Sequence, residues 1–168
     1  PANEKVADYM AEVMSEAGMK VDRYPYDIYM STDGGTSSID LVTPIRLPLN
    51  QQEYIMEKDP FSSDPALGKG WNAYSGSGDV TSTVVYANYG TKEDFEKLTE
   101  MGIDIKGKIV IARYGGNFRG FKAKFAEQYG AAGLIIYTDP ADSGYMKGLV
   151  YPNGVYYDES AIQRGSLL

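Results

Sequence analysis

Residues 107–139, GKIVIARYGGNFRGFKAKFAEQYGAAGLIIYTD, decide the fold of this chain. An apolar run at residues 109–112 ends at two glycines, a helical pattern follows, and a second apolar run occupies residues 134–137. This order predicts a strand, a helix and a second strand. Because two parallel strands need a crossover of about a dozen residues, which is usually a right-handed helix, the stretch predicts part of a parallel sheet.

The preceding residues extend this pattern by one more strand and one more helix. Residues 80–88 (VTSTVVYAN) read as a strand, and Thr91 followed by Asp94 resembles a capping box that begins a short helix. Gly102 is expected to end this helix. Its buried face is expected to consist of Phe95, Leu98 and Met101. The middle of the chain therefore predicts a β-α-β-α-β unit with three parallel strands.

The first third of the chain predicts one helix and a hairpin. Apolar residues recur at helical spacing between residues 3 and 17, and Gly18 is a typical stop. Residues 21–30 and 38–45 are interpreted as two strands joined by a turn at residues 31–35. Residues 48–72 have no sustained period, so we expect an ordered excursion across the surface.

Composition excludes several classes of function. The formal net charge is −7 and the chain has no basic run, which argues against a nucleic-acid partner. No apolar run approaches the roughly 20 residues that cross a bilayer. The first residues lack the basic and apolar regions of a signal peptide, so a signal is expected upstream if the protein is exported.

The chain contains neither cysteine nor histidine. Disulfides, thiolate metal sites, a Ser-His-Asp triad and histidine-ligated zinc therefore cannot be built from it. We expect this chain alone to be catalytically inactive and to bind no cofactor of its own.

Arg119 is the candidate binding residue that follows from these patterns. The strand at residues 107–114 leads directly into a turn, with Asn117 as the expected N-cap of the next helix. Arg119 would then lie in the first helical turn, where free N–H groups favour an anion, and its planar guanidinium could bind a carboxylate. The alternative is a solvated or internally paired arginine, because a cation at this end of a helix is mildly unfavourable.

Two other kinds of site are disfavoured by the spacing of their residues. In the segment GGNFRGFK, Phe121 lies between Gly120 and Lys122. A phosphate-binding loop has the lysine directly after this glycine, so the segment does not match one. Lys122 and Lys124 are interpreted as solvated residues on different helix faces. The acidic residues near the end of the chain lack calcium-loop spacing and are assigned to surface turns. These acidic residues are Asp139, Asp142, Asp158 and Glu159.

Several short motifs, taken together, resemble the protease-associated (PA) domain of the glutamate carboxypeptidase and transferrin receptor group. They are GKIVIARYG at residues 107–115, FRG at 118–120, GAAG at 130–133, DPAD at 139–142 and QRG at 163–165. The resemblance implies an α/β fold with three layers, β/β/α, in which a parallel central sheet is accompanied by an antiparallel second sheet and an N-terminal helix. It divides the chain into a helix at residues 1–18 that would pack on a catalytic domain, and a protease-associated domain at residues 19–168.

The resemblance also implies substrate-binding roles for Phe118, Arg119 and Ser166. In related peptidases the arginine of the FRG motif binds the C-terminal carboxylate of the substrate, which assigns that role to Arg119 and a pocket wall to Phe118. The family has an asparagine after Gln-Arg-Gly, where this chain has Ser166. The shorter hydroxyl argues against strict glutamate selectivity and leaves carboxylate recognition in place.

For the whole protein, the resemblance implies a zinc-dependent peptidase whose two zinc ions belong to a separate catalytic domain. The expected partners are that catalytic domain and a peptide with a free C-terminal carboxylate, and a homodimer of the full-length protein is left open. An extracellular or periplasmic location is expected. The alternatives are a non-catalytic interaction module of the transferrin receptor or sorting-receptor type, and a lid that only restricts access to a protease.

Overall fold

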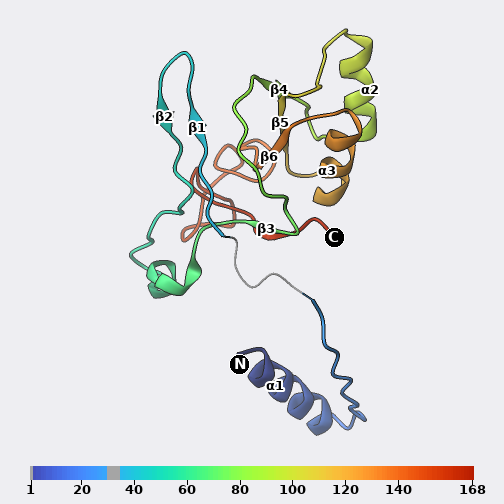
Figure 1. The fold of residues 1–168 in the computed structure, drawn as a ribbon. Coiled ribbons are helices and arrows are strands. Elements are labelled where there is room, and N and C mark those ends of the chain that lie inside the picture. The colour runs from blue at the N-terminus through green and yellow to red at the C-terminus, as the bar shows by residue number, and fades with distance from the viewer. Residues whose placement is uncertain (1, 30–34) are drawn as a thin grey trace. The chain divides into compact units, whose positions relative to one another are not determined.

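The computed structural model describes residues 2–29 and 35–168 of the chain (Figure 1). The chain divides into two compact units, Pro1–Met30 and Ser31–Leu168. The expected docking of the N-terminal helix on a catalytic domain stays a prediction.

The first unit consists of helix α1, Ala2–Glu16, and an extended segment. As predicted, Gly18 terminates the helix: it follows Glu16 by two residues with a positive φ of 81°, and the N–H of Met19 donates to the carbonyl of Met14 at 3.0 Å. The segment at residues 21–29 forms no strand, so the predicted hairpin is wrong. Instead, Arg23 contacts the helix through an ion pair with Asp8 at 2.8 Å. The turn predicted at residues 31–35 lies almost wholly outside the described residues.

The second unit begins with short strands and turns. Strand β1, Asp40–Leu41, pairs antiparallel with β2, Leu47–Pro48, which replaces the pairing predicted for the hairpin. The predicted surface excursion contains two short 3-10 helices and ends at strand β3. The bounds of these elements are Pro60–Ser63, Pro65–Leu67 and, for β3, Asn72–Ala73.

The predicted β-α-β-α-β unit is confirmed. Its three strands form a parallel sheet in the order β4-β5-β6, which helices α2 and α3 cover (Figure 1). The elements in chain order are β4 (Val84–Tyr86), α2 (Lys92–Glu100), β5 (Ile109–Arg113), α3 (Arg119–Gln128) and β6 (Gly133–Tyr137). Val110, the second residue of β5, lies opposite Val85 and Leu134.

The hydrophobic core lies between this sheet and its two helices. Its buried members are Ala87, Phe95, Leu98, Ile105, Val110 and Ala126. The predicted capping box of α2 is present, since the side chains of Thr91 and Asp94 each accept a bond from the other residue's backbone N–H. Met101 was expected in the core but is 63% exposed. It is the C-cap residue of α2 and lies beyond the last full turn of the helix.

The last strand brings the end of the chain to the start of α3. Strand β7, Gly165–Ser166, pairs parallel with β3, so residues separated by more than 90 positions lie side by side. The resulting fold, α/β with parallel and antiparallel sheets and an N-terminal helix, is the predicted fold class. Among the helices described, none is sufficiently long and apolar to cross a membrane.

Candidate functional site

Arg119 is the first residue of α3 and follows the carboxyl end of β5, as predicted. The predicted N-cap is wrong: Phe118 occupies the cap position and makes no side-chain capping bond. The Asn117 amide is engaged elsewhere, because its Nδ2 donates to the carbonyl of Gly90 at 3.3 Å and its Oδ1 accepts from Lys122 at 2.7 Å. No side chain therefore caps the first turn of α3.

The Arg119 side chain is half-buried and held by hydrogen bonds to neutral groups. Its Nε donates to the hydroxyl of Tyr114, and its Nη1 donates to the carbonyl of Ser166 at 3.3 Å. The guanidinium carbon lies 5.3 Å from the Tyr114 ring centroid and 5.6 Å from that of Phe118. Within the described residues, no carboxylate lies within ion-pair distance of this guanidinium, so its charge is available to an external anion.

Two glycines of the recognised motifs make room for this arrangement. A Cβ at Gly165 would overlap the guanidinium of Arg119. A Cβ at Gly120 would overlap the carbonyl oxygen of Leu167, where the chain after β7 crosses the first turn of α3. The FRG motif therefore packs closely against the chain at and after the QRG motif, and glycine is needed at both contacts.

Phe118 and Ser166 lie next to Arg119, so the structure brings the three predicted site residues together. Phe118 is 45% exposed and packs edge-to-face on Phe121, with ring centroids 6.3 Å apart, which leaves an apolar wall beside the guanidinium. Ser166 presents its carbonyl to Arg119, while its hydroxyl donates to the carbonyl of Leu168 at 2.6 Å. The substrate-binding role of all three residues stays a prediction.

Lys122 is fully buried, which corrects the prediction that it is solvated. Its ammonium donates to the carbonyl oxygens of Tyr89 and Gly115 and to the Oδ1 of Asn117. These three acceptors come from the turn before α2 and the turn before α3, so Lys122 joins the two turns at the carboxyl edge of the sheet. Burial lowers the pKa of Lys122 from 10.5 to about 8, an effect that the charge of Asp94 partly opposes.

Arg113, at the end of β5, organises a second charged cluster that sequence analysis missed. Its Nη1 lies 3.4 Å from Asp142 and 3.7 Å from Asp139, and its guanidinium stacks over the Tyr89 ring at 4.1 Å. Asp139 and Asp142, which were assigned to surface turns, are therefore ion-pair partners of an arginine. The sequence carried a signal for this cluster. Arg113 and Asp139 lie at the ends of neighbouring parallel strands, and the carboxyl ends of such strands meet at one edge of the sheet.

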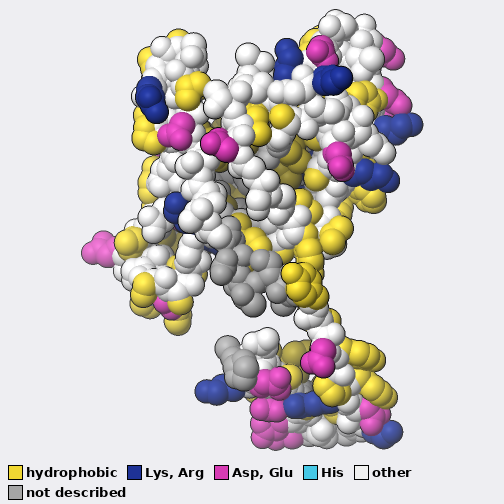
Figure 2. Space-filling model, viewed as in Figure 1, with side chains coloured by type: hydrophobic (Ala, Val, Ile, Leu, Met, Phe, Trp, Pro, Cys, Tyr) yellow, Lys and Arg dark blue, Asp and Glu magenta, His cyan; other side chains and the backbone are white. Residues whose placement is uncertain are grey.

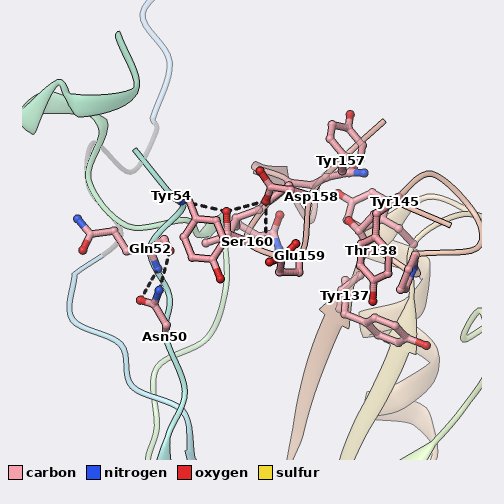
Figure 3. A pocket seen from close by; sticks show the side chains of 18 residues that line it. Asn50, Gln52, Tyr54, Tyr137, Thr138, Tyr145, Tyr157, Asp158, Glu159 and Ser160 are labelled. Carbon is pink, nitrogen blue, oxygen red and sulfur yellow. Dashed lines mark hydrogen bonds between the residues drawn. The ribbon is translucent and has the colours of Figure 1, made fainter. Parts of the chain in front are cut away.

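A cavity of about 480 Å³, shown in Figure 3, has Tyr114 in its wall but is not lined by Arg119. On one side, the Ser160 hydroxyl accepts from the Tyr54 N–H at 2.9 Å and donates to Asp158 at 2.7 Å. The described residues that line it include no Lys or Arg. This cavity therefore does not provide the positive charge that an anionic ligand needs.

The charge distribution fits a small anionic ligand better than a polyanion. In the unit of residues 31–168, Lys and Arg side chains on the face in Figure 2 are dispersed among Asp and Glu.

Within residues 2–29 and 35–168, no group of three or more His, Cys, Asp or Glu side chains could hold a metal ion. The zinc ions that the resemblance implies therefore do not fit a site in this part of the chain.

The PA domain family matches residues 77–165, which is more than half of the chain. This match covers the parallel sheet, both crossover helices and the FRG and QRG motifs, and the chain belongs to the PA domain family. The resemblance inferred from the motifs is confirmed.

Within this family the chain is similar to glutamate carboxypeptidase-like proteins. A probable glutamate carboxypeptidase of Arthroderma benhamiae is 39% identical over 98% of this chain, and a glutamate carboxypeptidase 2 homolog of Caenorhabditis elegans is 36% identical over 99%. The aminopeptidase NAALADL1 of Mus musculus is 39% identical over 61% of the chain. The chain spans 23% of the length of each of the first two relatives and 14% of the third.

Proposed function

We propose that this chain is the substrate-recognition domain of a zinc-dependent glutamate carboxypeptidase-like peptidase, in which Arg119 binds the C-terminal carboxylate of a peptide. The observation that supports this role is a guanidinium held by neutral groups at the start of α3, with no carboxylate partner in the described residues. A bidentate pair with a substrate carboxylate would satisfy its remaining N–H groups. Phe118 would form the apolar wall beside that carboxylate.

In this proposal the chain orients the substrate and breaks no bond. A separate catalytic domain of the same protein supplies the two zinc ions, which activate the attacking water. Arg119 contributes by holding the end of the peptide at a fixed distance from that centre. The chain by itself is therefore inactive.

One relative is named as an aminopeptidase, so aminopeptidase activity is the main competing function. An aminopeptidase recognises a free α-amino group, which carries a positive charge and would be repelled by Arg119. A non-catalytic interaction module, a second competing function, would show no turnover at all. Both alternatives differ from the proposed function in their response to the substrate's C-terminal carboxylate.

The experiment compares the intact protein with its Arg119→Ala variant on matched peptides that end in a free carboxylate or an amide. We expect the variant to raise KM for the free-carboxylate peptide by about tenfold to 100-fold, because a charge-assisted pair is lost. KM for the amide should change little. The exposed Lys124→Ala on the same helix is the control for loss of positive charge. Equal KM values for wild type and Arg119→Ala on the free-carboxylate peptide would refute the proposal.

A further inference from the structure

We propose that Tyr114 is a positioning residue that fixes the orientation of the Arg119 guanidinium and restricts carboxylate binding to the Nη1–Nη2 end of that group. This inference rests on the proposed function, since it concerns how Arg119 receives its ligand. No part of the recognised motif pattern assigns a role to the Tyr114 hydroxyl.

The inference starts from the contact between the end of β5 and the start of α3. Tyr114 directly follows β5, and its hydroxyl accepts a hydrogen bond from the Nε of Arg119. Tyr114 is itself half-buried, and its backbone N–H donates to the carbonyl of Tyr137 in β6 at 2.8 Å, which anchors the residue to the sheet. The phenol hydroxyl therefore provides a fixed hydrogen-bond acceptor for the Arg119 side chain, which is long and would be flexible without this bond.

A guanidinium offers two edges to a carboxylate, one formed by Nε and Nη2 and the other formed by Nη1 and Nη2. The Tyr114 hydroxyl occupies Nε, which blocks the first edge for bidentate binding. The Ser166 carbonyl accepts one N–H of Nη1 at 3.3 Å and leaves the other N–H of that nitrogen. Nη2 and the remaining N–H of Nη1 are therefore the donors that are left for a carboxylate.

This arrangement lowers the cost of binding because the arginine is ordered before the ligand arrives. An unanchored arginine loses rotamer freedom when it binds, whereas Arg119 is already held at Nε and Nη1. Gly165 adds to the restriction, because the backbone of β7 lies directly against the guanidinium. The Tyr114 hydroxyl thus contributes to substrate affinity through Arg119 without contacting substrate.

The test is Tyr114→Phe in the intact protein, which removes the acceptor and keeps the ring. KM for the free-carboxylate peptide should rise by about fivefold, since an anchoring bond to a charged group is lost while kcat is unchanged. KM for the matched peptide amide should not change. Tyr145→Phe, at an exposed tyrosine of the same unit, is the control and should behave as wild type.

A double-mutant cycle separates positioning from a structural effect. In an Arg119→Ala background, Tyr114→Phe should have no further effect on KM, because the group through which it acts is absent. An equal KM increase in both backgrounds, or an equal increase for the carboxylate and amide peptides, would overturn the inference.

The same data distinguish failure of the inference from failure of the proposed function. If Arg119→Ala raises KM for the free-carboxylate peptide and Tyr114→Phe does not, the role of Tyr114 is wrong and the role of Arg119 stands. If Arg119→Ala leaves carboxylate selectivity unchanged, the proposed function itself is wrong and the inference is lost with it.

Discussion

Replacing Lys122 by methionine should destabilise the fold more than any change to an exposed lysine on the same helix. Methionine has a similar length and fills the same buried space, so it keeps water away from the oxygens that the ammonium now contacts. These are the carbonyls of Tyr89 and Gly115 and the Oδ1 of Asn117. The substitution therefore leaves three acceptors without a donor at the junction of two turns.

The magnitude follows from two opposing contributions. Three acceptors that lose their partner, at about 2 kcal/mol each, cost about 6 kcal/mol. The lowering of the Lys122 pKa from 10.5 to about 8 corresponds to about 3 kcal/mol that burial of the ammonium costs and that methionine avoids. The net loss is about 3 kcal/mol, which for a domain of this size lowers Tm by about 10 °C.

The assay is thermal unfolding of the 168-residue chain followed by circular dichroism, with Lys124→Met as the matched control. Lys124 lies two residues further along α3 and is exposed, so its replacement should change Tm by no more than about 2 °C. If Lys122→Met and Lys124→Met unfold at the same temperature, the interpretation of Lys122 as a clamp between the two turns is wrong.

Two further predictions concern acid stability and the approach of β7 to α3. Burial raises the pKa of Asp94, but hydrogen bonds from Asn88 and Thr91 outweigh this effect, and the net pKa is lowered below 3.8. The unfolded chain therefore binds more protons in acid, so this stabilisation is present above about pH 4 and is lost as the pH falls through the folded-state pKa. Asp94→Asn should flatten the fall of Tm below pH 4, and an unchanged profile would contradict this. Gly165→Ala should displace the Arg119 guanidinium and raise KM of the intact protein for a free-carboxylate peptide. KM for the matched peptide amide should change little. Unchanged KM values would contradict the close approach of Gly165 to the guanidinium.

The parallel sheet could be predicted from sequence because its signals are local. The apolar runs of β5 and β6, the capping box at Thr91 and the stop at Gly102 each lie within a few residues of the element they define. The position of Arg119 followed from the same pattern, since topology alone places a residue after a strand at the carboxyl edge of the sheet.

The features that sequence analysis missed depend on contacts between distant segments. Lys122 is buried because the turns at residues 89–90 and 115–117 meet around it. The spacing of apolar residues in the helix does not indicate this contact between the two turns. Gly165 reaches Arg119 only because β7 pairs with β3, more than 90 residues earlier. The predicted hairpin failed for the same reason, because strand pairing is decided by partners that an alternating pattern does not identify.

The proposed carboxylate site predicts a specific difference in inhibition of the intact protein. Free glutamate and glutamate α-amide differ at the carboxylate that Arg119 is proposed to bind, so their Ki values measure that contact without involving bond cleavage. Wild-type protein should bind free glutamate at least about tenfold more tightly than the amide, and Arg119→Ala should bring the ratio close to one. A ratio that is the same in wild type and Arg119→Ala would contradict the assignment of Arg119 to the substrate carboxylate.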